Sequence, residues 1–123
     1  MFSKQAIVRY RDETPVAPWP FGPMQRIVSG GEGGVANVHV AKVTKSLPTF
    51  FHTGYDEIYY VLSGTGTVTL DGQTHRVRPG CTAVIPAGVS HSLEADCDEG
   101  LEFVIFGWPP MPIGDDRAKP RAV

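Results

Sequence analysis

The chain has 123 residues, enough for one domain, with 41% hydrophobic residues and a formal net charge of −2. Its 11 basic and 13 acidic residues form no long run of either sign, which argues against the basic surface that nucleic acids require. The longest apolar stretch is far shorter than the ~20 residues of a membrane-spanning helix. The N-terminal residues lack the apolar segment of a secretory signal, and a cytoplasmic location is expected.

The N-terminal third is divided by glycine and proline into short extended segments. Residues 5–11 fit a first strand, and a short strand, a turn and a further strand are expected at 25–29, 30–34 and 36–44. Four prolines lie within residues 15–23. Because proline removes backbone donors, this segment is predicted to be an extended arm, neither a helix nor a central strand.

Strand and turn signals become dense from residue 57 onward. The dipeptide Asp71-Gly72 is the strongest of them, because this pair favours the two-residue turn of a β-hairpin. Four prolines in residues 109–123 predict a second arm. The strands expected in this part of the chain cover residues 57–62, 67–70, 74–77, 82–86, 91–95 and 101–106.

No segment of helical length keeps a 3.6-residue apolar period without a glycine or proline break. Many short strands with frequent turns therefore predict an all-β sandwich or barrel, and the strand pattern alone does not separate the two.

Two motifs narrow this choice. The first runs from His52 to Glu57 and continues to Gly64; the second runs from Gly80 through Pro86-Ala-Gly88 to His91. Together they resemble the paired signatures of the cupin superfamily, in particular its small single-domain members of the mannose-6-phosphate-isomerase-like and cupin 2 type. The resemblance implies a single double-stranded β-helix, or jelly-roll barrel, over residues 36–106. Residues 1–35 and 107–123 would then be arms within the same domain.

The resemblance also implies a metal site at His52, Glu57 and His91. Two imidazoles and a carboxylate suit Fe(II) and also hold Mn, Ni or Zn, and three protein ligands leave positions open for water or substrate. The chain departs from the family pattern at Phe50, where the first motif histidine is usual, and at Ala95, where asparagine is common. A vestigial site that binds a ligand without metal is therefore the alternative.

Strand parity indicates which side chains line the barrel. Residues at alternate positions share one face of a strand, so Phe50 is expected to point the same way as His52. His39 and His75 are interpreted as structural, although His39 could supply a compensating ligand. The expected lining residues, which would serve equally well as barrel core, are Phe50, Tyr59, Val61, Phe103 and Ile105.

These patterns favour a metal-dependent protein that acts on a small organic molecule, with oxygenase, isomerase or lyase chemistry as the family analogy. The alternative is a non-catalytic ligand-binding or sensor protein, and no catalytic acid or base is located. A homodimer is expected because a lone barrel would leave the apolar side chains of the two arms exposed. Those side chains are Trp19, Phe21, Trp108 and Met111.

Overall fold

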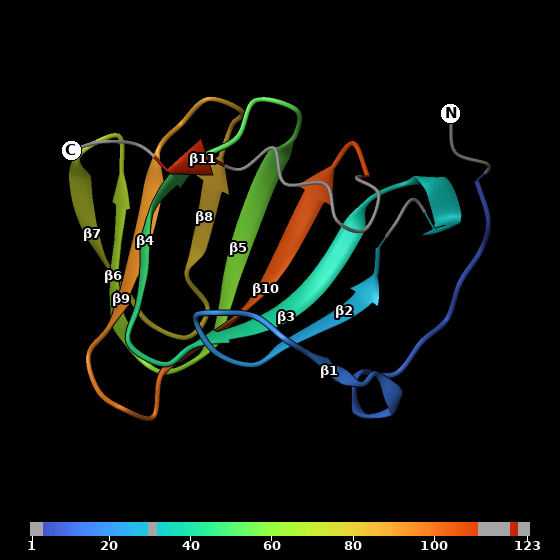
Figure 1. Ribbon diagram of the computed structural model, residues 1–123, viewed down its shortest axis with the longest axis horizontal. Coiled ribbons are helices and arrows are strands. Elements are labelled where there is room, and N and C mark those ends of the chain that lie inside the picture. The colour runs from blue at the N-terminus through green and yellow to red at the C-terminus, as the bar shows by residue number, and fades with distance from the viewer. Residues whose placement is uncertain (1–3, 30–31, 111–118, 121–123) are drawn as a thin grey trace.

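The computed structural model describes residues 4–29, 32–110 and 119–120. The strands form two antiparallel sheets that face each other (Figure 1). The first sheet, in spatial order, contains β1 (Val16–Ala17), β2 (Met24–Val28), β3 (Asn37–Val43), β10 (Leu101–Trp108), β5 (Asp56–Ser63) and β8 (Thr82–Ile85). The second contains β11 (Lys119–Pro120), β4 (Ser46–Phe51), β9 (His91–Ala95), β6 (Gly66–Leu70) and β7 (Gln73–Val77). The predicted all-β jelly-roll is confirmed.

The N-terminal segment joins the first sheet. Strand β2 pairs with β3, and β1 forms the sheet edge between Pro15 and Pro18, where missing backbone donors are tolerated. Trp19 and Phe21, in the loop between these strands, pack against the hydrophobic core. The strand expected at residues 5–11 is wrong, because residues 4–10 have no regular structure and Arg11–Glu13 form a 3-10 helix, η1.

The second arm is described only in part. Residues 111–118 and 121–123, with Met111 among them, lie outside the described residues. Strand β11 pairs with β4 at the edge of the second sheet. A second 3-10 turn, η2 (Glu32–Gly34), precedes β3. Within the described part of the chain, no helix is long and apolar enough to cross a membrane.

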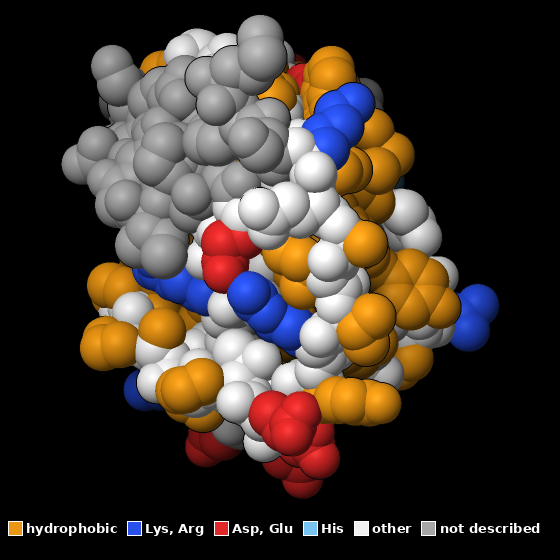
Figure 2. All heavy atoms as spheres, turned by 90° about the vertical axis from the view of Figure 1, so that its right-hand side faces the viewer, with side chains coloured by type: hydrophobic (Ala, Val, Ile, Leu, Met, Phe, Trp, Pro, Cys, Tyr) orange, Lys and Arg blue, Asp and Glu red, His pale blue; other side chains and the backbone are white. Residues whose placement is uncertain are grey.

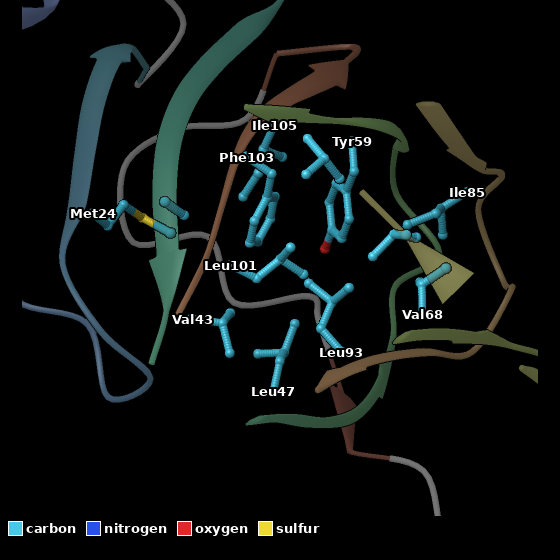
Figure 3. Packing of buried hydrophobic residues seen from close by; sticks show 13 residues of the cluster. Met24, Val43, Leu47, Tyr59, Val68, Ile85, Leu93, Leu101, Phe103 and Ile105 are labelled. Atoms are coloured by element: carbon cyan, nitrogen blue, oxygen red, sulfur yellow. The ribbon is translucent and has the colours of Figure 1, made fainter. Parts of the chain in front are cut away.

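The hydrophobic core fills the space between the sheets (Figure 3). Buried and more exposed positions alternate along β10, where Leu101, Phe103 and Ile105 are buried and the intervening side chains are more exposed. The aromatic rings of Tyr59 and Phe103 contact each other across neighbouring strands at a centroid distance of 4.8 Å. The core also includes Met24, Ala41, Val43, Leu47, Val61, Val68, Val77, Ile85 and Leu93.

The hairpin predicted at Asp71-Gly72 joins β6 to β7. Both residues have positive φ angles, 46° and 83°, as a type I′ turn requires. The turn sets the register in which Val68 lies opposite His75. His75 is nevertheless exposed, and its strand, β7, is the edge strand of the second sheet.

The outer face of the first sheet carries exposed apolar side chains. Phe106, Ile58 and Val84 occupy neighbouring positions across β10, β5 and β8, and their exposed fractions are 40%, 39% and 60%. Further hydrophobic side chains are visible beside charged groups when the molecule is viewed from the β1–β2 side (Figure 2). An apolar row on a sheet surface is typical of a protein interface.

Candidate metal centre

Three side chains from both sheets converge inside the barrel. His52 follows directly after β4, His91 is the first residue of β9, and Glu57 lies in β5 of the opposite sheet. One potential ligand atom from each residue lies within 4.8 Å of the other two. The structure thus brings together the three residues that the two motifs singled out.

Glu57 lies between the two imidazoles. Its Oε1 atom is 2.9 Å from His52 Nε2 and 3.8 Å from His91 Nε2. The histidines are 1% and 3% exposed, whereas the Glu57 side chain retains some access to solvent. The three polar atoms therefore lie close together in a largely buried position.

Backbone carbonyls fix the orientation of both imidazoles. His52 Nδ1 lies 3.0 Å from the carbonyl oxygen of Tyr55, and His91 Nδ1 lies 3.1 Å from that of Val89. A carbonyl oxygen only accepts hydrogen bonds, so each Nδ1 carries the proton and donates it. Nε2 of each imidazole is thereby turned toward Glu57, at 2.9 Å for His52 and 3.8 Å for His91. Carbonyls that accept from Nδ1 orient metal-ligating histidines in the same way, with Nε2 as the atom that would bind the ion.

Burial keeps His91 in the neutral form. It lowers the pKa of His91 below its usual value, and this outweighs the opposing effects of Val89 and Glu57. A neutral imidazole is the form that binds a metal ion. His91 is therefore ready to act as a ligand at neutral pH.

The loop of the second motif is tied to the first motif by backbone hydrogen bonds. Gly88 N–H donates to His52 O at 2.6 Å, and Ala87 N–H donates to the carboxylate of Asp56 at 2.8 Å. Gly88 has a φ of 89°, a conformation that side-chain-bearing residues rarely adopt, which explains the glycine at this motif position. These bonds hold the segments that carry His52, Glu57 and His91 in a fixed mutual arrangement.

Asp71 holds the other side of the His91 segment. Its Oδ1 atom accepts hydrogen bonds from Ser90 N–H at 2.9 Å and from the Ser90 hydroxyl at 3.0 Å. The hairpin turn thus also anchors the residue that precedes His91.

Two tyrosines complete the site, and sequence reasoning did not assign these contacts. The ring of Tyr55 stacks on His52 at 4.0 Å, and the hydroxyl of Tyr59 donates to Glu57 Oε1 at 3.4 Å. Burial, together with the nearby Glu57 carboxylate, raises the pKa of Tyr59 well above its usual range. Tyr59 is therefore a protonated hydrogen-bond donor at neutral pH. Parity placed Tyr59 inside the barrel, but no local signal identified its partner.

The other residues predicted to line a pocket lie at different depths. Val61 and Phe103 are paired in register within the core, and Ile105 lies beside Tyr59. Phe50 is partly buried opposite His91 in the β4–β9 pair, and its ring contacts Phe21 at 5.9 Å.

His39 does not complete the ligand set. It lies on the inner side of β3, but it is absent from the group of ligand atoms formed by His52, Glu57 and His91, the one such group among the described residues.

Comparison with known proteins gives a consistent family match. A family model described as "Cupin domain" matches residues 36–107. An uncharacterized protein from Methanocaldococcus jannaschii is 36% identical over 64 residues, which cover 50% of this chain and 51% of the relative. The chain thus spans about half the length of the curated relatives it matches.

Solved structures extend the similarity to nearly the whole chain. A protein from Planctomyces limnophilus superposes with a TM-score of 0.79 at 25% identity, covering 90% of this chain and 95% of that one. Ectoine synthase from P. lautus superposes with a TM-score of 0.78 at 16% identity, covering 96% and 91%. The second likeness concerns the fold alone.

Proposed function

Because this chain belongs to the cupin domain family, we propose that it binds one divalent metal ion through His52, Glu57 and His91 and acts on a small organic molecule in the barrel. The observation that carries the proposal is the convergence of three lone-pair atoms within 4.8 Å of one another. Both imidazoles contact a carbonyl through Nδ1 and turn Nε2 toward Glu57, so an ion bound between the three residues would replace the direct contact of His52 Nε2 with Glu57. The resemblance in fold to ectoine synthase, an enzyme, supports chemistry on a small molecule.

The donor set restricts the identity of the ion. Two nitrogen atoms and one carboxylate oxygen suit Fe, Mn, Ni or Zn better than Mg or Ca, which prefer oxygen ligands. A bound ion would supply Lewis acidity toward an oxygen atom of the small molecule. Tyr59 would hold the Glu57 carboxylate by its hydrogen bond, and Tyr55 would hold the plane of His52.

Phe50 supports a second candidate, a cupin that binds a small molecule without catalysis. An aromatic ring occupies the position at which the family resemblance places a further histidine, and it packs against Phe21. The remaining three ligands would then bind metal weakly or serve as polar contacts for the small molecule.

Cobalt(II) binding tests the proposed site. Purified protein is stripped of metal and titrated with Co(II), and the visible absorption of the bound ion is followed. We expect one ion per chain in the wild type and in His75→Ala, because His75 is exposed and remote from the site. His91→Ala should lose most of the affinity. Equal affinities for His91→Ala and His75→Ala would refute the assignment.

The homodimer remains a prediction, with a different supporting surface. Trp19 and Phe21 cover this chain's own core, so they do not require a partner. The exposed row of Ile58, Val84 and Phe106 supports a dimer through the outer face of the first sheet. Light scattering should give twice the chain mass of 13.3 kDa at micromolar concentration, and Val84→Asp should reduce it to a single chain. A single-chain mass for the wild type would contradict the prediction.

A further inference from the structure

Two buried nitrogen atoms beside the candidate metal centre lack a hydrogen-bond partner. They are Nε of Arg26 and Nε2 of His39, and neither atom has a hydrogen-bond partner in the described part of the chain. Protein interiors satisfy nearly all buried polar groups, and an unsatisfied donor costs about 1–3 kcal/mol, more when it is charged. In the folded protein such atoms are completed by ordered water or by a bound ligand.

The register of the first sheet places both side chains on its inner face. Arg26 lies opposite His39 in the β2–β3 pair, and two residues further along, the buried residues Met24 and Ala41 lie opposite each other. Because inward positions alternate along a strand, Arg26 shares the face of Met24 and His39 shares the face of Ala41. Both polar side chains thus point into the barrel.

The same register connects this pair to the candidate metal centre. His39 lies opposite Ile105 on β10, and Ile105 lies opposite Tyr59 on β5, the tyrosine whose hydroxyl contacts Glu57. Two strand spacings separate His39 from Tyr59, a distance of about 10 Å between their backbones. The side chains that extend from the two strands take up part of this distance, and a molecule of a few carbon atoms is long enough to cover the rest.

Gly107 is a residue without a side chain on the strand between β3 and Glu57. It lies opposite both Asn37 and Glu57 on the inner face of β10. A Cβ atom at this position would lie 3.7 Å from the Asn37 side chain and 3.9 Å from that of Tyr55, which is ordinary contact with no overlap.

The two residues have complementary donor chemistry. The guanidinium of Arg26 is a fixed positive charge with planar paired donors, which match a carboxylate. Burial, with a smaller effect of Arg26, lowers the pKa of His39 to about 4, so His39 is neutral at pH 7. A neutral imidazole with its proton on Nε2 donates one hydrogen bond without adding a second buried charge.

We propose that Arg26 and His39 form a carboxylate-binding subsite, and that the small molecule bound in the barrel is an organic acid whose second oxygen atom faces His52, Glu57 and His91. This inference rests on the proposed function and specifies its substrate class. The positive charges of a divalent ion and Arg26 together exceed the single negative charge of Glu57. An anionic ligand would therefore also reduce the net charge of the site.

The test compares pyruvate with pyruvamide, which has the same skeleton without the charge. Both are titrated calorimetrically into wild-type protein, with and without bound Co(II). We expect pyruvate to bind at least about tenfold more tightly than pyruvamide, because the amide cannot form the charge-assisted bonds. Arg26→Gln should weaken pyruvate binding about 10- to 100-fold and leave pyruvamide and cobalt binding unchanged.

Matched variants separate the subsite from general charge effects. Arg78→Gln removes an exposed arginine and should change nothing. Arg26→Lys should retain part of the affinity, and His39→Gln should weaken pyruvate binding less than Arg26→Gln does. Circular dichroism checks that each variant is folded. If Arg26→Gln does not fold, the pyruvate affinities of His39→Gln and Arg26→Lys still test the subsite.

Equal binding of pyruvate and pyruvamide, or pyruvate binding that does not depend on Arg26, would overturn the inference. Normal cobalt binding in that case would leave the proposed metal site intact. Conversely, absence of cobalt binding in the wild type would refute the metal site, while Arg26-dependent binding of pyruvate to the metal-free protein would still establish the subsite.

Discussion

The two ends of the barrel are built from the same strands but differ in what fills them. At one end the inward positions of β3, β5 and β10 are Val43, Val61 and Leu101, all at most 4% exposed. At the other end the same strands present Asn37, Glu57 and Gly107.

The contrast separates stability from function. Close-packed apolar side chains stabilise the closed end, since burial of apolar surface is the main driving force for folding. The polar end gathers His52, Glu57 and His91, and on the sheet that carries Glu57, Nε of Arg26 and Nε2 of His39 are buried without a hydrogen-bond partner among the described residues. The comparison predicts that mutations at the closed end act on unfolding, and that mutations at the polar end act on binding.

The largest effect is expected at the closed end. Phe103 is 1% exposed, and Phe103→Ala should lower the free energy of unfolding by about 3–5 kcal/mol through lost burial and a cavity. Urea denaturation measures this loss, with Val104→Ala on the outer side of the same strand as the control. Cobalt affinity should be nearly unchanged in the folded variant. A loss no greater than that of Val104→Ala would contradict the distinction between the two ends.

The second prediction concerns acid pH and His39. Its pKa is lowered to about 4 in the folded protein by burial, whereas an unfolded chain has a value near ~6.5. As pH falls below ~6.5 the unfolded state binds the proton first, so stability is lost between these two values, by up to ~3 kcal/mol. Urea denaturation of the metal-free protein at pH 7.5 and 5 should show a larger loss in the wild type than in His39→Gln. Parallel losses would place His39 in a solvated environment.

Glu57→Gln tests the carboxylate of the metal site. The amide keeps the shape but removes the negative charge, so Co(II) affinity should fall by at least about 100-fold, equivalent to ~2.7 kcal/mol. The unfolding free energy of the metal-free protein should change far less than in Phe103→Ala. His75→Ala is the control, and an equal effect on cobalt affinity would mean that the ligands are misassigned.

Phe50→His asks whether the polar end accepts a further ligand. Phe50 lies opposite His91 on the neighbouring strand, and directly opposed residues share a face. An added imidazole should tighten Co(II) binding by about tenfold, or ~1.4 kcal/mol. Titration calorimetry on the wild type and the variant measures the change. Unchanged affinity would mean that the side chain at position 50 points away from the ion.

The smallest effect is expected for Tyr59→Phe. The ring packs in the core, whereas the hydroxyl only donates a long bond of 3.4 Å to Glu57. Its removal should cost about 1 kcal/mol of unfolding free energy. Tyr60→Phe, on the exposed face of the same strand, is the control in urea denaturation. A loss comparable to that of Phe103→Ala would show that the hydroxyl belongs to the stabilising core.

The sequence by itself determined the all-β class and, through its resemblance to the cupin signatures, indicated the jelly-roll barrel and the candidate trio of His52, Glu57 and His91. Proline and glycine breaks with period-two alternation excluded helices, and Asp71-Gly72 specified a hairpin because few dipeptides tolerate two positive φ angles. The resemblance of the two motifs to the cupin signatures pointed to His52, Glu57 and His91, and the structure places their potential ligand atoms together. These features depend on local backbone conformation and on motif spacing, and both can be read directly from the amino-acid sequence.

Only the tertiary structure decided the partners of these side chains. The strand expected at residues 5–11 was wrong. Trp19 and Phe21 pack against the hydrophobic core of their own barrel, a long-range contact that no local sequence pattern predicts. The carbonyls that orient the histidines and the alignment of Arg26 with His39 likewise depend on which segments pair or pack together. Pairing between distant strands is set by the burial of the whole core, so local sequence patterns do not specify it.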